Sequence, residues 1–99
     1  MDSYTLYVAL RADRCLDDAA VAAVGAPLRP DDEDLCIWRD ADAPAVLRVS
    51  ADCLAADLEA ALELGHALAA ETQALGPGLA VEEVVAMTDD EQLVWRARP

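Results

Sequence analysis

The first segment of the chain alternates hydrophobic and polar positions, and this alternation predicts a β-strand from Tyr4 to Leu10. Tyr4, Leu6, Val8 and Leu10 fall on one side of the strand, and Thr5, Tyr7 and Ala9 fall on the other. Aromatic and β-branched residues favour extended backbone, which supports the same interpretation.

Helical spacing then replaces the period of two and predicts a short helix. Its apolar positions are Leu16, Ala20, Ala23 and Val24, and they follow the acidic residues Asp13, Asp17 and Asp18. Carboxylates suit the positive end of a helix, and Gly25 with Pro27 would end it, so we expect about 8–10 helical residues.

A hairpin is predicted next. The stretch from Leu28 to Asp34 carries four consecutive acidic residues and reads as a solvated loop. A strand from Leu35 to Asp40 and an alternating strand from Ala45 to Val49 follow, joined by turn-forming residues. Because the connection is short, we expect these two strands to be antiparallel.

The longest predicted helix begins at a cap on Ser50 or Asp52 and ends near Leu75. Its apolar stripe comprises Leu54, Leu58, Ala61, Leu62, Gly65, Leu68, Ala69, Thr72 and Leu75. A helix of about 24 residues would be about 36 Å long and would overhang strands of about 17–23 Å. The side opposite the stripe carries mainly alanine, at Ala56, Ala60, Ala67, Ala70 and Ala74. This thinly polar side could contact a partner, or could reflect the high helix propensity of alanine.

Gly76-Pro77-Gly78 would end this helix, and two apolar runs, 79–87 and 92–97, predict a terminal hairpin. The element order is then β-α-β-β-α-β with one added strand. This order resembles a ferredoxin-like α+β sandwich, in which two helices cover one face of an antiparallel sheet. We therefore expect one domain over residues 1–99, with the first and third strands in the middle of the sheet.

The charge of the chain restricts its partners. Twenty acidic residues stand against seven arginines, with no lysine, which gives a formal charge of −13. Such a surface repels phosphate backbones and anionic lipids, so we expect neither nucleic acid nor membrane as a partner, and a basic protein is favoured. The absence of lysine, asparagine and phenylalanine is also typical of GC-rich bacterial genomes, so part of the acidity could be genomic.

The ends and the cysteines indicate a cytoplasmic protein. Met1 is followed directly by Asp2 and a predicted strand, and no stretch reaches the ~20 apolar residues that a bilayer span needs. Cys15, Cys36 and Cys53 are odd in number and lack metal-binding spacing, so we expect reduced thiols.

If the helices cover the side with Leu6, Val8, Ile37, Leu47 and Trp95, apolar residues remain on the opposite side of the sheet. The candidate site on that side consists of Tyr7, Arg11, Trp38, Val46, Arg48, Val94 and Arg96, with Cys36 among them. Such a face could close against a second copy in a homodimer, which we favour, or hold a small anionic or aromatic ligand. Ordinary cross-strand packing of arginine stems on aromatic rings would give the same pattern.

Catalytic and metal-binding signals are weak. The runs Asp31-Asp32-Glu33-Asp34 and Asp89-Asp90-Glu91 lack the alternating ligands and central glycine of a calcium loop, so no metal is assigned. His66 follows Glu63 by three residues, and an ion pair or hydrogen bond with this glutamate is a commoner role for such a histidine than acid–base catalysis. We expect no cofactor and no catalytic residue.

Three hypotheses remain from the sequence. The leading one is a non-catalytic acidic interaction protein, a homodimer that binds another protein. The second is a binder of a small ligand, or a cofactorless enzyme, that uses the candidate face. The third is a structural subunit of a larger assembly.

Overall fold

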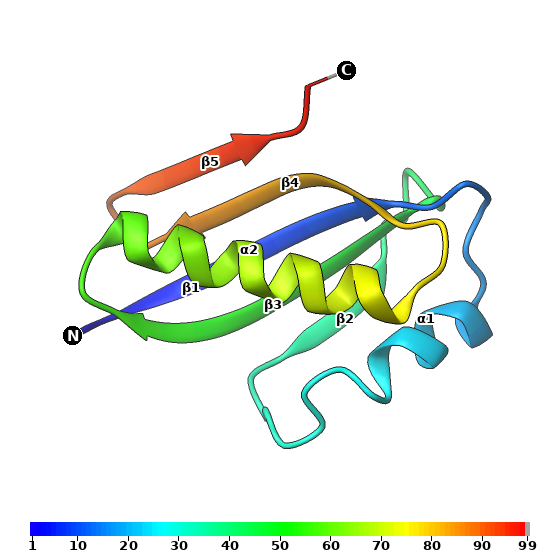
Figure 1. Cartoon of the computed structure of the whole chain (residues 1–99), viewed down its shortest axis with the longest axis horizontal. Coiled ribbons are helices and arrows are strands. Elements are labelled where there is room, and N and C mark those ends of the chain that lie inside the picture. Colours follow the sequence, from blue (N-terminus) through cyan, green and yellow to red (C-terminus); the bar gives the residue numbers. More distant parts are fainter. Residues whose placement is uncertain (99) are drawn as a thin grey trace.

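Residues 1–98, which the computed structural model describes, form five strands and two helices (Figure 1). In chain order these are β1 (Asp2–Arg11), α1 (Asp18–Gly25), β2 (Cys36–Arg39), β3 (Val46–Ala55), α2 (Leu58–Leu75), β4 (Ala80–Met87) and β5 (Gln92–Arg96). Every predicted element is present, and the largest difference lies between β3 and α2.

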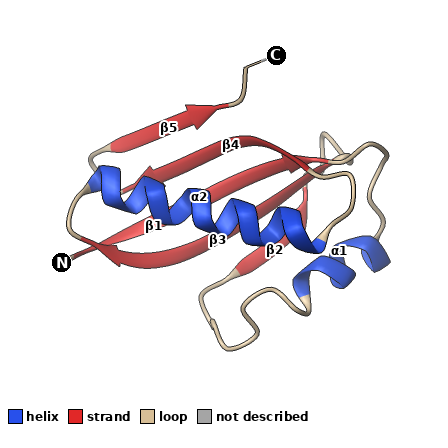
Figure 2. Ribbon diagram, viewed as in Figure 1, coloured by secondary structure: helices blue, strands red, loops and turns tan. Residues whose placement is uncertain are grey.

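The strands form one open antiparallel sheet in the order β2-β3-β1-β4-β5, and the two helices pack on it (Figure 2). The α+β class, the antiparallel sheet and the two packed helices are confirmed. β1 lies at the centre with β3 beside it, which is the interior placement expected for these strands. The five-stranded order, with β5 outside β4, differs from the four-stranded ferredoxin-like sheet.

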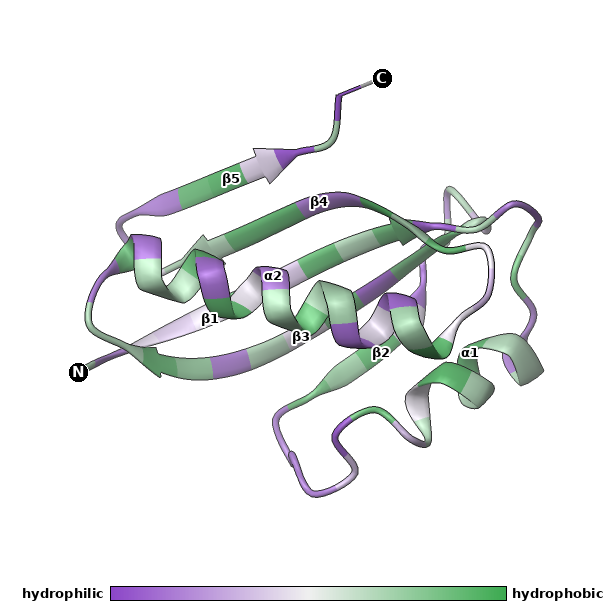
Figure 3. Cartoon of the chain, in the orientation of Figure 1, coloured by the Kyte–Doolittle hydropathy of each residue, from purple (hydrophilic) through white to green (hydrophobic). Residues whose placement is uncertain are grey.

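The core lies between α2 and the sheet. Leu6, Val8 and Leu10 of β1 are almost fully buried, as are Val49 of β3 and Val84 of β4. Figure 3 shows hydrophobic and hydrophilic residues alternating along α2, as expected for a helix with one buried side. Thr72 is a fully buried polar residue of this helix, and its hydroxyl donates a hydrogen bond of 2.8 Å to the Leu68 carbonyl.

Gly65 permits the close approach of α2 to the sheet. A Cβ atom at this position would lie 2.7 Å from a methyl group of Val84 and 3.7 Å from one of Leu6. The shorter distance is well inside van der Waals contact, so a side chain here would push the helix away from β4 or displace Val84.

The prediction that the long helix begins near Ser50 or Asp52 is wrong. β3 continues through these residues to Ala55, because the whole of Val46–Ala55 pairs with Asp2–Arg11 of β1. The helix begins instead after Asp57, whose carboxylate accepts a hydrogen bond of 2.8 Å from the Ala60 amide. Asp17 caps α1 in the same way, through the Ala20 amide at 2.8 Å.

The shorter helix also removes the expected overhang. With 18 residues, α2 is about 27 Å long, whereas the ten-residue strands β1 and β3 reach about 33 Å. Ala67, Ala70 and Ala74 are exposed on α2, but Ala56 precedes the helix and Ala60 is half-buried. Neither helix of residues 1–98 has both the length and the apolar content required to cross a bilayer.

Candidate functional site: the open face of the sheet

The strand register places all seven candidate residues on the side of the sheet opposite α2, here called the open face. Directly opposed residues in antiparallel strands share a face, so each pair can be assigned from its partner. The pairs are Tyr7 with Ser50 and Val85, Arg11 with Val46, Trp38 with Arg48, Val85 with Val94, and Glu83 with Arg96.

Several large apolar side chains of the open face are exposed. Tyr7 on the central strand is 41% exposed, Trp38 on β2 is 39% exposed, and Val94 on β5 is 36% exposed. Val46, by contrast, is buried and adds little to the surface. The apolar surface therefore extends from one edge strand to the other through the centre of the sheet.

Leu54 belongs to the same face and was missed by the sequence analysis. It had been assigned to the apolar stripe of the long helix, but it lies on β3 and is 62% exposed. The same alternation turns Asp52 to the open face, where the Thr5 hydroxyl donates to its carboxylate at 3.3 Å. The period of two in Ser50–Leu54 was the signal that could have revealed this.

Each arginine of the open face is bonded to a carboxylate of its own chain. The Nε of Arg48 donates to the Asp40 carboxylate at 2.6 Å, and that of Arg96 donates to Glu83 at 2.8 Å. Arg11 pairs with Glu82. The hydrogen bond from Arg48, with a second one from the Asp42 amide, holds the pKa of the Asp40 carboxyl below its ordinary value.

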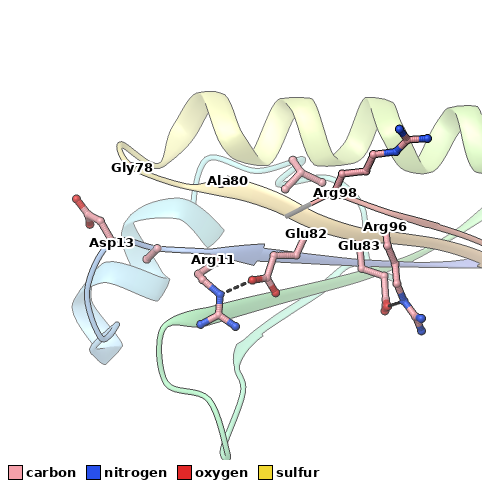
Figure 4. Close-up of a pocket in the computed structure, with 11 residues that line it drawn as sticks. Arg11, Asp13, Gly78, Ala80, Glu82, Glu83, Arg96 and Arg98 are labelled. Carbon is pink, nitrogen blue, oxygen red and sulfur yellow. Dashed lines mark hydrogen bonds and ion pairs between the residues drawn. The ribbon is translucent and has the colours of Figure 1, made fainter.

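A hollow of about 620 Å³ lies at the end of the sheet where β5 stops (Figure 4). Arg11, Arg96 and Arg98 are among its lining residues. Figure 4 shows the guanidinium groups of Arg11 and Arg96 on the side opposite α2 and that of Arg98 on the α2 side. The three cations therefore do not converge on one point, and two of them are paired with glutamates.

The histidine and the three cysteines do not gather at one place: Cys36 lies on the open face opposite Ser50, whereas Cys53 lies opposite Tyr4 on the α2 side. The ring of His66 packs edge-on against Trp95, with ring centroids 5.1 Å apart. All three cysteines are free thiols; Cys15 and Cys36 are exposed, whereas Cys53 is half-buried and burial raises the pKa of its thiol. Within residues 1–98, no three histidine, cysteine or acidic side chains come together in a metal-binding cluster.

The acidic runs form hydrogen-bonded turns. The Asp32 carboxylate accepts from the Asp34 amide at 3.1 Å, and the Thr88 hydroxyl accepts from the Glu91 amide at 3.1 Å. These bonds account for the local backbone conformation without any bound ion.

Comparison with known proteins identifies no relative: no family model, no curated protein and no solved structure matches the chain. Inferences about function therefore depend on the surfaces of the molecule itself.

Proposed function

We propose that the chain is a non-catalytic interaction protein that forms a homodimer through its open face and binds a basic protein through its acidic surfaces. The observation that carries this proposal is the composition of the open face. Exposed apolar side chains lie there beside arginines that are already neutralised by their own carboxylates.

The charge distribution favours this face for self-association. The three ion pairs cancel, and Asp52 adds one negative charge to this face, so most of the net charge of −13 belongs to the rest of the molecule. Two copies repel each other on most approaches, and the repulsion is smallest where the surface is nearly neutral. A second copy can therefore cover the open face at a lower electrostatic cost than any strongly acidic surface.

The open face is close to the smallest size that suits a dimer. Only β1 and β3 have ten residues, whereas β2 has four, β4 eight and β5 five. At about 3.3 Å per residue and about 4.8 Å between strands, the sheet covers about 590 Å². This is near the lower limit, about 600 Å², of what each partner contributes to a stable interface. A two-fold axis through the face would bring Tyr7 of both copies to the centre of this contact.

The helix side would remain available to a second protein. Exposed carboxylates there include Asp17 at the start of α1 and Glu59 and Glu63 on α2, whereas Asp18 is paired with Arg39 and Glu71 with Arg29. A basic partner would be attracted to this surface, and its affinity would fall as salt concentration rises.

Light scattering at low and high salt concentration tests the dimer and separates it from partner binding. Screening reduces repulsion between two acidic copies, so the proposal expects a dimeric mass that is kept or strengthened in high salt. A monomeric mass at all protein and salt concentrations would refute the dimer and with it the leading function.

A small-ligand function is the second candidate, because three arginines line the hollow at the end of the sheet, which is large enough for a small anion. Asp13, Glu82 and Glu83 line it as well, so an anion would have to displace the glutamates that now pair with Arg11 and Arg96. A thermal-shift series with inorganic phosphate and di- and tricarboxylates tests it. A rise in melting temperature that is lost on Arg11→Gln would support a ligand site. A flat response across the series would count against it.

We also propose that the architecture is ferredoxin-like with β5 added at one edge. The order β1-α1-β2-β3-α2-β4 and the adjacent central strands β3 and β1 support this description. A chain truncated after Thr88 is expected to keep its circular dichroism spectrum and cooperative unfolding, because the four-stranded unit retains the α2 core. Loss of cooperative unfolding would argue against an independent four-stranded unit.

A cytoplasmic location is a further proposal, supported by the three free thiols in a chain of 99 residues. Fractionation of cells that express a tagged chain tests it, and recovery from an oxidising compartment would contradict it.

A further inference from the structure

β5 is an edge strand with apolar side chains on both of its faces. Val94 lies on the open face and is 36% exposed, whereas Trp95 lies on the α2 side and is 38% exposed. Leu93 is half-buried beside it on the α2 side. This strand lies at the outer edge of the sheet, next to β4 (Figure 1). Its outward backbone groups and these side chains are available to a further strand.

Most of the devices that prevent edge pairing are missing from this strand. Proteins commonly protect an edge with proline, a charged side chain, a bulge or a very short strand. β5 has no proline and pairs with β4 in one continuous register, and its one charged residue, Arg96, stands at its end and is paired with Glu83. The opposite edge differs, because β2 has four residues and lies beside α1, and its Arg39 donates to the Leu16 carbonyl at 2.8 Å.

The two ends of β5 have opposite charges. The turn before the strand carries Asp89, Asp90 and Glu91, and the residues at its other end include Arg96 and Arg98. If two copies of β5 pair in the antiparallel direction, the acidic end of each copy meets the basic end of the other. In a parallel pair, like charges would lie side by side, which is unfavourable.

We propose that β5 pairs with β5 of a second copy in antiparallel orientation, centred on Val94, so that two sheets join into one continuous sheet. In this register Val94 lies opposite its own counterpart, Leu93 lies opposite Trp95, and Asp90 lies opposite Arg98. The contact is two-fold symmetric and forms each of the latter two pairs twice. The occupant of the edge is therefore a second copy of this chain, selected by charge complementarity.

On the α2 side, this register brings Leu93 and Trp95 of both copies together across the two-fold axis. Trp95 is already supported by His66 of its own chain, with ring centroids 5.1 Å apart. The pairing buries apolar side chains on both sides of the joined sheet in addition to forming backbone hydrogen bonds.

The edge contact uses the backbone edge of β5, whereas the proposed open-face dimer uses one side of the sheet. Val94 belongs to both, but neither contact requires the other. If both form, the assembly closes as a tetramer where the two two-fold axes intersect at a right angle, and otherwise extends into a chain. Measurements that report separately on the edge and on the face are therefore needed.

A charge-exchange experiment tests the edge contact. In the proposed register, Asp90→Arg places an arginine opposite Arg98 of the second copy, and Arg98→Glu places a glutamate opposite Asp90. Both residues are exposed, so folding should be unaffected. Each variant alone should associate through the edge about tenfold more weakly than the parent, because like charges then face each other. An equimolar mixture should recover association as a mixed dimer, seen by native mass spectrometry. Equal association of both single variants and the parent would overturn the proposal.

Amide hydrogen exchange provides the second readout. Alternate β5 amides point outward, and they should become protected as protein concentration rises, whereas an open-face dimer leaves them exposed. Concentration-dependent dimerisation without this protection would overturn the edge contact and leave the open-face proposal intact. Protection of the β5 amides while Trp38 stays exposed to solvent would support the edge contact and refute the open-face dimer.

Discussion

Replacement of Tyr7 by serine should weaken dimerisation strongly if the open face is buried between two copies. Tyr7 lies on the central strand and is 41% exposed in the single chain. A tyrosine side chain has about 200 Å² of surface, so about 80 Å² per copy would become buried on association. At about 25 cal/mol per Å², this is about 2 kcal/mol per copy and about 4 kcal/mol per dimer. The dissociation constant should therefore rise about 1,000-fold.

Leu64→Ser is the matched control. Leu64 is 42% exposed, almost the same fraction as Tyr7, but it lies on α2 on the other side of the sheet. Sedimentation equilibrium of both variants and the parent measures the dissociation constants, and circular dichroism verifies that each remains folded. The reasoning is refuted if Tyr7→Ser leaves the constant unchanged, or if Leu64→Ser weakens association equally.

Three further predictions concern the single chain. Gly65→Ala should lower the free energy of unfolding in urea by about 1–2 kcal/mol. The clash with β4 costs about 1–3 kcal/mol and exceeds the gain in helix propensity, which is up to about 1 kcal/mol. A more stable variant would contradict the tight contact between α2 and the sheet. The bond from Arg48 stabilises ionised Asp40, so its contribution to stability should be present above about pH 4 and lost as the pH falls through the lowered pKa. A carboxyl NMR titration of Asp40 with a midpoint at or above the ordinary aspartate value would contradict this. Cys53 should react with a disulfide reagent near pH 8 more slowly than exposed Cys15, because burial raises the pKa of its thiol; equal rates would show that Cys53 is accessible.

The secondary structure was predictable where one periodicity dominated. The alternation in β1 and the stop signal at Gly76-Pro77-Gly78 gave elements close to the observed ones. The segment from Ser50 to Ala56 was assigned wrongly, because alanine and leucine are compatible with both periods and two aspartates resemble helix caps. This segment is a strand because it pairs with β1. The two strands are about 45 residues apart in the sequence, so local sequence patterns do not indicate this pairing.

The composition of the open face followed from strand alternation, but its electrostatics did not. Arg96 and Glu83 face each other through the β4–β5 register, and Arg48 reaches Asp40 in the turn before its strand. Pairing of this kind depends on register and rotamers, which the sequence does not specify. The exposure of Leu54 was hidden by the same error that extended the helix.

The central claim, that a second copy covers the open face in solution, is tested most directly by the accessibility of Trp38. The chain has two tryptophans of nearly equal exposure, Trp38 at 39% on the open face and Trp95 at 38% on the other side. In a Trp95→Phe variant, acrylamide quenching of the remaining tryptophan should fall markedly as protein concentration rises from the monomeric to the dimeric range. Quenching of Trp38 that stays constant across a range in which the mass doubles would show that the open face remains exposed to solvent and would contradict the account.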